Sequence, residues 1–470
     1  MQTVMSNEGS TFMNGVEDEI QYIWRRNCPY LYDTMLSYTL EWPTLTIDWL
    51  PNSYKSVDGS YSVHKIIYGT HTSDQEPNYL IIAEVHISDL EENEDLMNVE
   101  SFAEYSYNPD NTNMNTVQFE VKAKLNHPEE VNKALHMPEH PFVIASRVVN
   151  GDILVFDYSK HESFPTDDLV HPQLLLKGHS KEGYAMDWGN GVSNNYLISG
   201  GSDNIINLWD FNNNTYGILN SSARNHFNYP NKINVDSQES YELSPPILKP
   251  IKSISWHNSV VNDLKWHPSD PSIFGSVSDD GTFSIWDLRS LSENSPNLFR
   301  KTESGINTLS FNQFVPTMVS TGNLDGIVQI WDIRNTKEEL FSLNFHSEKP
   351  IICMEWSKWS PNILITGGVD NKVIVWDLYK NHSYKENDTS YSCNNDENIN
   401  NNNQINEDHI KAHSQQDSSD PNAVFIHYGH TAPITSISWN PNEHGDPLLI
   451  ASASEDNTIQ FWQFSDTFLN

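Results

Sequence analysis

The stretch Ser199-Gly-Gly-Ser-Asp203-Asn-Ile-Ile-Asn-Leu-Trp209-Asp210 decides the fold of this chain. It places a Ser four residues before an Asp, and a Trp six residues after that Asp, while His179 lies 24 residues upstream of Asp203. A single Ser, His and Asp would suggest a hydrolase triad. The same spacing occurs five times in 470 residues, however, and an enzyme needs one triad per site. The repetition therefore indicates a structural unit.

The other four copies keep the spacing and also end in Trp. They are Ser276/Asp280/Trp286, Thr321/Asp325/Trp331, Thr366/Asp370/Trp376 and Ser452/Asp456/Trp462, and upstream histidines accompany three of them, His257, His346 and His430. Short runs with period-two alternation flank each Asp-containing turn, as is typical of antiparallel strands. We expect the Asp, His, Ser/Thr and Trp of one copy to be hydrogen-bonded together under the turn.

The Trp-Asp endings at 209–210, 286–287, 331–332 and 376–377, with Trp462-Gln463 as a variant, resemble the WD-repeat family. The resemblance implies four-stranded sheets arranged radially as the blades of a propeller. Inner-strand patterns at 45–51, 131–138, 183–189, 261–268, 306–316, 351–361 and 434–441 predict seven blades. Blades one and two lack Trp-Asp, and Phe156-Asp157 takes its place in the second. The sequence therefore predicts an all-β, seven-bladed WD-repeat β-propeller.

We divide the chain into an N-terminal tail and helix at 1–34 and the propeller at 35–470, closed by a strand at 35–40. In the N-terminal part, Val16, Ile20, Ile23 and Trp24 share one helix face, which is expected to pack on the last blade. Asn14 with Glu17 resembles an N-cap pair, and Cys28-Pro29 is expected to end the helix. Stretches near 88–116, 212–248 and 379–422 lack apolar periodicity and are predicted to be loop insertions.

Composition narrows the class of partner. With 27 Lys and Arg against 63 Asp and Glu, the net charge of −36 argues against direct nucleic-acid binding. It favours basic partners, although an acidic surplus can also serve solubility alone. The three cysteines, Cys28, Cys353 and Cys393, show no paired or metal-ligand spacing, and no signal peptide or long apolar run opens the chain. We expect a reducing cytosolic or nuclear compartment and no membrane segment.

The chain offers no candidate for catalysis. It has no metal-ligand cluster and no Gly-rich phosphate loop after a strand, and the repeat accounts for every Ser/His/Asp set. We therefore predict no enzymatic activity, no cofactor and no metal.

Segments outside the repeats resemble one family. They include Trp24-Arg-Arg-Asn-Cys-Pro-Tyr-Leu-Tyr-Asp33, Leu40-Glu-Trp-Pro-Thr-Leu-Thr46, Tyr68-Gly-Thr-His-Thr-Ser-Asp74 and Gly429-His-Thr-Ala432. These look like the retinoblastoma-binding, Msi-type WD-repeat histone chaperones. The resemblance implies a non-catalytic, monomeric propeller that binds histones H4 and H3 within chromatin assembly, deacetylase, acetyltransferase, remodelling and Polycomb-type complexes, in the nucleus and partly in the cytoplasm. The alternative is a general propeller scaffold, such as a ubiquitin-ligase substrate receptor or a ribosome-assembly factor, which needs no Leu-Glu-Trp-Pro segment.

The family resemblance implies a groove for the first helix of histone H4, between the N-terminal helix and the loop before the last blade. Tyr30 and Leu31 match one apolar wall, Phe425 and Ile426 match the other, and Asp417 and Asp420 are candidates for an acidic rim. The loop itself departs from the family, because a long Asn-rich insertion replaces a compact acidic one. The alternative is that Phe425 and Ile426 pack inside an outer strand of blade seven.

The resemblance also implies an acidic top face, around the central channel, that holds a basic H3-type tail. The matching positions are Glu41, Trp42, His71, Glu130, Asn132, Glu182, Tyr184, Asn307 and Glu455. Carboxylates there would bind Arg and Lys, and the aromatic rings would stack on guanidinium groups. The alternative is that these acids are ordinary solvated loop residues. Where the family commonly has acids this chain has Pro128, Asn262, Gly305 and Pro350, and Ile352 replaces an aromatic residue, so we expect weaker tail binding.

Overall fold

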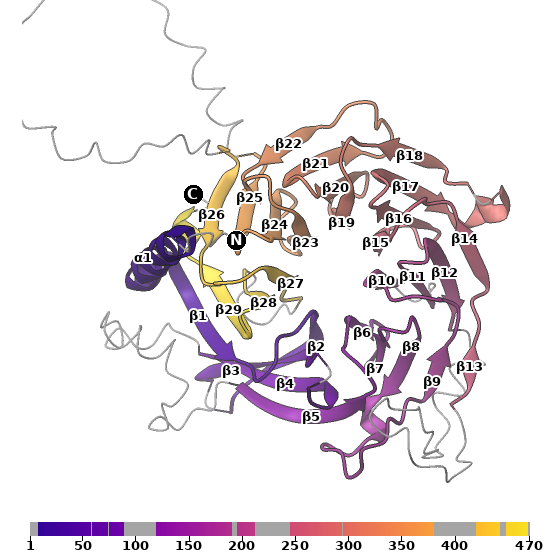
Figure 1. The fold of residues 1–470 in the computed structure, drawn as a ribbon, viewed down its shortest axis with the longest axis horizontal. Helices are drawn as coiled ribbons and strands as arrows, with labels where there is room; N and C mark the ends of the chain where they lie inside the picture. Colours follow the sequence, from indigo (N-terminus) through magenta and orange to yellow (C-terminus); the bar gives the residue numbers. More distant parts are fainter. Residues whose placement is uncertain are drawn as a thin grey trace, which may run out of the picture.

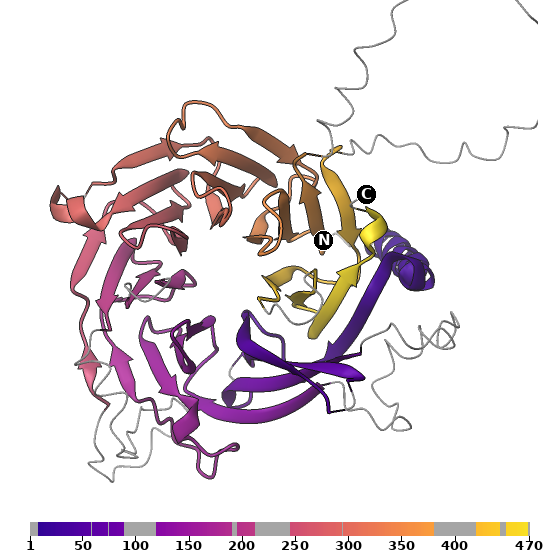
Figure 2. The ribbon, with the colours of Figure 1, turned by 180° about the vertical axis from the view of Figure 1, so that it is seen from behind.

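The computed structural model of the protein describes residues 8–57, 59–73, 75–88, 119–189, 195–211, 245–293, 295–379, 420–441 and 448–468. Within these ranges the strands form seven sheets, placed radially around a central channel (Figure 1, Figure 2). The predicted seven-bladed β-propeller is therefore confirmed. Most residues of the three predicted insertions lie outside the described ranges.

The blades follow one another along the chain, each with its first strand nearest the channel. Blade one is β2 (Ile47–Lys55), β3 (Tyr61–Gly69), β4 (Asn78–Ser88) and β5 (Phe119–His127), and blade two is β6 (Lys133–Met137), β7 (His140–Arg147), β8 (Ile153–Asp157) and β9 (Leu174–Leu176). Blade three is β10 (Met186–Trp188), β11 (Tyr196–Gly200), β12 (Ile205–Asp210) and β14 (Lys252–Ser255), and blade four is β15 (Val261–Trp266), β16 (Ile273–Ser278), β17 (Thr282–Asp287) and β18 (Leu298–Lys301).

The remaining blades repeat this order, and the last one takes its outer strand from the N-terminal part of the chain. Blade five is β19 (Ile306–Phe311), β20 (Met318–Asn323), β21 (Ile327–Asp332) and β22 (Phe341–Asn344). Blade six is β23 (Ile351–Trp356), β24 (Ile363–Gly368), β25 (Val373–Asp377) and β26 (Ala423–His427), and blade seven is β27 (Ile434–Trp439), β28 (Ile450–Ser454), β29 (Thr458–Phe464) and β1 (Tyr32–Thr39).

Two strand pairings complete the ring. Antiparallel pairing of β1 with β29 places Met35 opposite Trp462, which confirms the predicted closing strand. Closure removes the open sheet edges at the two ends of the chain. A short strand that the sequence did not predict, β13 (Ile247–Leu248), pairs in parallel with β9 and gives blade two a fifth strand. It belongs to the C-terminal end of the stretch that we expected to be a loop insertion.

The repeated residues form the expected hydrogen-bonded set. In blade three, His179 joins Asp203 through Nδ1 (3.1 Å) and Ser199 through Nε2 (2.8 Å), and Trp209 Nε1–H donates to the Ser199 hydroxyl (2.8 Å). Corresponding bonds unite His257, Ser276 and Trp286; His346, Thr366, Asp370 and Trp376; and His430, Ser452, Asp456 and Trp462. These side chains are thus structural.

Blades two and five each lack part of this hydrogen-bonded set. In blade five, Trp331 Nε1–H still donates to Thr321 Oγ1 (3.0 Å), but one Asp325 carboxylate oxygen is buried without a partner among the described residues. In blade two, Phe156 is fully buried where blades three to seven have Trp, as predicted, and His127 still joins Ser146 (3.0 Å).

Neighbouring blades are joined at the channel by side chains that accept backbone N–H groups of the next inner strand. In each pair the backbone N–H of the first residue donates to the side-chain oxygen of the second: His136 to Asp48 (2.8 Å), Trp266 to Asp187 (2.8 Å), Leu309 to Asp263 (3.0 Å), Trp356 to Ser310 (3.3 Å), Trp439 to Glu355 (2.8 Å) and Ile47 to Ser436 (3.1 Å). Between blades two and three, Trp188 Nε1–H donates to the Leu135 carbonyl instead (3.1 Å). Polar inner-strand residues therefore fix the order and spacing of the blades.

The N-terminal helix differs from its prediction. It spans Glu8–Leu31 (α1), so Asn14 and Glu17 lie inside it and do not cap its start, and Pro29 lies within its last turn. Trp24 and Cys28 are buried on the propeller, whereas Ile20 and Ile23 are 43% and 51% exposed. The side chain of Val16 lies outside the described part of the structure.

Polar contacts explain why the predicted helix face was wrong. Gln21 Nε2–H donates to the Tyr428 carbonyl (2.7 Å), and Trp24 Nε1–H donates to the Tyr32 hydroxyl (2.9 Å). These bonds hold the helix face made by Gln21, Trp24 and Cys28 against the propeller. The sequence did not indicate this face, because a glutamine is not typical of a buried helix face.

The repeat makes a testable prediction about stability. Asp203→Ala would leave the His179 Nδ1–H and the Ser180 N–H without an acceptor, at a cost of about 2–3 kcal/mol. Asp325→Ala is the matched control, because that blade has no histidine at the repeat spacing and one Asp325 oxygen already lacks a partner in the described structure. Thermal melting should show a larger loss of Tm for Asp203→Ala. Equal losses would mean that the hydrogen bonds of the set do not stabilise the blade.

Candidate peptide-binding surfaces

The top face is the end of the channel at which the inner strands begin. The candidate residues of this face divide into groups that the structure holds at separate blades. Glu130 and Asn132 precede β6, Glu182 and Tyr184 precede β10, and Asn307 lies near the start of β19. The segment between β1 and β2 carries Glu41 and Trp42, and turns carry His71 and Glu455.

The first group lies between blades two and three. Tyr184 is half exposed, and burial of the rest of its ring raises the pKa of its hydroxyl, with further increases from the Glu182 and Glu130 carboxylates. The two carboxylates therefore act on the same phenol, although they belong to different blades. A cationic side chain placed there would meet both negative charges and a neutral aromatic ring.

The second group lies at blade one. Trp42 Nε1–H donates to Glu76 (2.9 Å), and the His71 N–H donates to the Pro43 carbonyl (3.0 Å), so the two segments are fixed to each other. Burial raises the pKa of Tyr79, and Asp168, Glu76 and Glu41 add to the increase. Asp168 and Glu76 were not predicted as members of this face, because they lie outside the motifs that carried the resemblance.

The third group corrects the prediction for blade four. One amide N–H of Asn307 donates to the Ile351 carbonyl (3.0 Å), and its Oδ1 accepts from Asn262 Nδ2 (3.3 Å). Asn262, where we expected a lost acid, donates to the exposed carboxylate of Asp279 (2.6 Å) and holds that charge beside the channel. Asp279 precedes Asp280 just as the candidate Glu455 precedes Asp456, so the repeat register could have identified it. Glu455 itself is exposed in blade seven.

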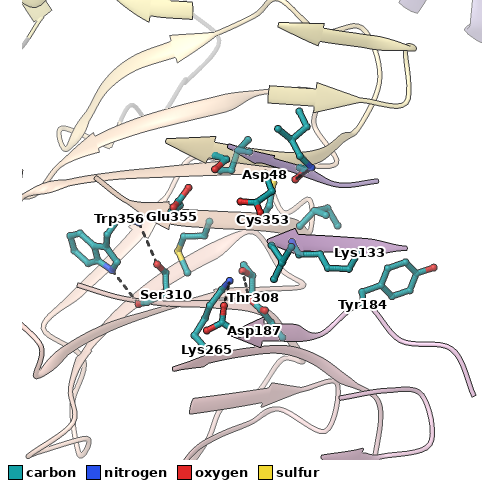
Figure 3. A pocket seen from close by; sticks show the side chains of 18 of the residues that line it. Asp48, Lys133, Tyr184, Asp187, Lys265, Thr308, Ser310, Cys353, Glu355 and Trp356 are labelled. Carbon is teal, nitrogen blue, oxygen red and sulfur yellow. Dashed lines mark hydrogen bonds and ion pairs between the residues drawn. The ribbon is translucent and has the colours of Figure 1, made fainter. Parts of the chain in front are cut away.

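The channel between the blades holds a cavity of about 440 Å³ whose lining is charged (Figure 3). Its ion pairs are Lys265 with Asp187 (3.5 Å), His136 with Asp48 (2.6 Å) and Lys358 with Glu355 (3.2 Å). Burial alone would lower the pKa of His136, but the Asp48 carboxylate outweighs it and raises that pKa. The sequence did not predict this lining, because inner-strand residues of seven blades meet there only after closure.

The candidate groove at the side of the propeller lies where α1, β1 and β26 are neighbours (Figure 1). Leu31 and Phe425 belong to one apolar cluster, and the exposed Tyr30 lies beside Leu31 at the end of α1. Phe425, however, is only 5% exposed and packs on the rings of Tyr32 (5.2 Å) and Phe468 (5.2 Å).

The alternative interpretation of the opposing wall is therefore right for Phe425. It lies inside an outer strand, although that strand, β26, belongs to blade six and not to blade seven. Ile426 points to the other face of β26 and packs against a different cluster. The sequence also missed Phe468, which covers Phe425 from the C-terminal 3₁₀ helix Asp466–Phe468.

Of the two acids predicted for the rim of this groove, Asp420 lies within the described structure. The carboxylate of Asp420 accepts the N–H groups of Asn422 (3.0 Å) and Asn344 (3.1 Å), so it forms a turn within the fold. Asp417 lies outside the described residues.

A hydrogen-bonded chain ties α1 to the last blade. The Trp24 indole donates to the Tyr32 hydroxyl, which bonds His427 Nδ1 (2.7 Å), and His427 Nε2 bonds Gln460 Oε1 (2.9 Å). The His427 ring is fully buried and stacks on Trp462, with 4.4 Å between centroids. Burial holds the pKa of His427 well below its usual value, so the ring is neutral and accepts from Tyr32.

Phe425 is therefore predicted to be a stability residue. Phe425→Asp would bury a carboxylate among aromatic rings and should lower the Tm by at least several degrees. Tyr30→Asp, at a position that is 71% exposed, should leave the Tm nearly unchanged. A normal melt for Phe425→Asp would show that this ring is more accessible than its contacts indicate.

The described residues provide neither a metal site nor a membrane span. Among them, no group of three or more His, Cys, Asp or Glu side chains is arranged to hold a metal ion. No helix within the same ranges combines the length and apolarity needed to cross a membrane.

Two family profiles match the chain. A profile described as histone-binding protein RBBP4 or a CAF1 complex component matches residues 19–89, which run from α1 through β4. A profile described as WD domain, G-beta repeat, matches residues 171–210, 248–287, 337–377 and 421–463. The first match contains Tyr30, Leu31, Glu41, Trp42 and His71, so it covers candidate residues of both surfaces.

Proposed function

The chain belongs to the WD-repeat histone-binding proteins of the retinoblastoma-binding, Msi type, and from that premise we propose that it is a non-catalytic histone chaperone and scaffold within chromatin assembly and chromatin-modifying complexes. The observation that carries the proposal is the match of residues 19–89 to a histone-binding profile, because these residues include most of α1, all of β1 and the first three strands of blade one. Generic propellers do not require that helix. A nuclear location, with a cytoplasmic fraction, follows from such a role.

The side groove is proposed to bind the first helix of histone H4. Tyr30 and Leu31 offer an exposed and a half-buried apolar side chain at the end of α1, beside the cluster that contains Phe425. An amphipathic helix binds such a surface through its apolar face. Since Phe425 is covered, its role is to support Leu31 from beneath, and direct contact falls to the α1 side chains.

The top face is proposed to bind a basic tail of the H3 type. Glu41, Glu130, Glu182 and Glu455 come from four separate segments, and Glu76 and Asp279 add carboxylates beside them. Arg and Lys side chains gain charge-assisted hydrogen bonds from such groups. The net charge of −36 also favours the approach of a basic peptide. The retained acids at blades one to four support tail binding at this face.

Calorimetric titration with a peptide of the first H4 helix tests the groove. Tyr30→Asp should weaken one-to-one binding by about tenfold or more, because a charge replaces an apolar contact. Tyr22→Asp is the matched control, since Tyr22 is 66% exposed on the same helix but is not among the residues proposed to contact H4, and it should bind as the wild type does. Absence of wild-type binding at tens of micromolar would overturn the proposed groove function.

A triple variant tests whether the two surfaces are separate. Glu41→Gln, Glu182→Gln and Glu455→Gln together should weaken binding of a basic H3-tail peptide by about tenfold and leave H4 binding unchanged, because these acids lie away from α1. Raising the salt concentration should reduce H3 binding in the wild type more than in the variant. Equal loss of both ligands would contradict the two-site arrangement.

A further inference from the structure

Lys133 is an unusual cation at the mouth of the channel. It begins β6, lines the cavity and lies at the same end as Tyr184, with Glu355 and Trp356 at the opposite end (Figure 3). Lys265, Lys358 and His136 each have a carboxylate partner in the channel. Within the described ranges, the ammonium group of Lys133 has no hydrogen bond or ion pair.

The two carboxylates that act on Lys133, Asp263 and Asp48, have other partners. The Asp263 oxygens accept from Thr308 Oγ1 (2.9 Å), the Leu309 N–H (3.0 Å) and the Leu264 N–H (2.9 Å). Asp48 pairs with His136 (2.6 Å). Burial, followed by repulsion from Lys265, lowers the pKa of Lys133 below its usual value. An oxygen acceptor close to Lys133 would therefore stabilise its charged form.

A second donor beside Lys133 also lacks an acceptor. Asn132 is 3% exposed and lines the same cavity, and its Nδ2 has no hydrogen-bond partner in the described structure. Leaving a buried donor unpaired costs about 1–3 kcal/mol, so the site gains when an acceptor arrives. We refer to Asn132 and Lys133 together as the throat.

The surroundings of the throat have the opposite charge. Glu130 and Glu182 lie close enough to Tyr184, which lines the cavity mouth, to raise its pKa. A ligand at this mouth would thus meet the Glu130 and Glu182 carboxylates together with two donors that lack acceptors in the described structure. Such an arrangement complements a ligand that carries positive charge and, next to it, one anionic oxygen group.

We propose that the throat binds a carboxylate, so that the top face prefers basic peptides containing one Asp or Glu over peptides that are basic throughout. This inference rests on the proposed top-face function and adds a specificity to it. The rim would hold the flanking Arg or Lys residues, while Lys133 and Asn132 would donate to the carboxylate. An all-basic peptide would instead place a cation against Lys133.

The test measures the affinity of four Arg-rich peptides that differ at one central residue, Glu, Gln, Ala or Lys. For the wild type we expect the Glu peptide to bind about tenfold more tightly than the Ala peptide, and the Lys peptide to bind least. Lys133→Met keeps the apolar stem and removes the charge, so it should reduce the Glu-to-Ala ratio to about one. Lys349→Met, at an exposed top-face lysine outside the cavity lining, should preserve the ratio.

The outcomes separate this inference from the function on which it rests. Binding of all four peptides with equal affinity, or an unchanged Glu-to-Ala ratio in Lys133→Met, would overturn the throat alone. Failure of every peptide to bind would overturn the top-face function and the throat with it. If sodium propionate removes the Glu preference of the wild type but does not affect Lys133→Met, the throat accepts a free carboxylate as well as a peptide side chain.

Discussion

Closure of the propeller by β1 is the constraint on which the rest of the structure depends. Blade seven is complete only when β1 pairs with β29, and this pairing brings the N-terminal part of the chain against its last strands. The same pairing places α1, which runs directly into β1, beside β26 and the final blade (Figure 1). The side groove is therefore a consequence of ring closure. Its attachment is polar as well as apolar, because Trp24, Tyr32 and His427 form one buried hydrogen-bonded chain.

The inner strands bring polar side chains of neighbouring blades together at the channel once the ring is closed. Side chains such as Asp48, Asp187 and Glu355 accept N–H groups from the following blade, so the acids that line the channel also hold the blades in register. Lys265 and Lys358 also pair with Asp187 and Glu355, and His136 pairs with Asp48 when its ring is protonated. The channel is consequently close to neutral, in contrast to the acidic rim above it. Lys133 interrupts this pattern at the mouth, because its ammonium pairs with no described carboxylate although the chain has a net charge of −36.

The structural role and the proposed ligand-binding role belong to different positions of the same repeat. The Asp of each repeated set is held beneath its turn, whereas the residue before it reaches the top face as Asp279 or Glu455. A substitution of the repeat Asp is therefore expected to affect stability, whereas a substitution of the residue before it is expected to affect binding. The same separation applies to the side groove, where Phe425 supports the cluster from within and Tyr30 remains exposed.

The sequence by itself determined the seven blades, the closing strand and the structural nature of the Ser/His/Asp sets, because these follow from a repeated local spacing and strand periodicity. It also identified the family, through segments outside the repeat. It misjudged the buried face of α1, where Gln21 faces the propeller and Ile20 does not, since that choice depends on carbonyl groups about 400 residues away in the chain. Only the tertiary structure decided that Phe425 is core, that Asn262 holds Asp279, and that Lys133 has no ion pair with any described residue at the channel mouth. These properties depend on which side chains meet after closure, and residues from seven blades become neighbours only when the ring is complete.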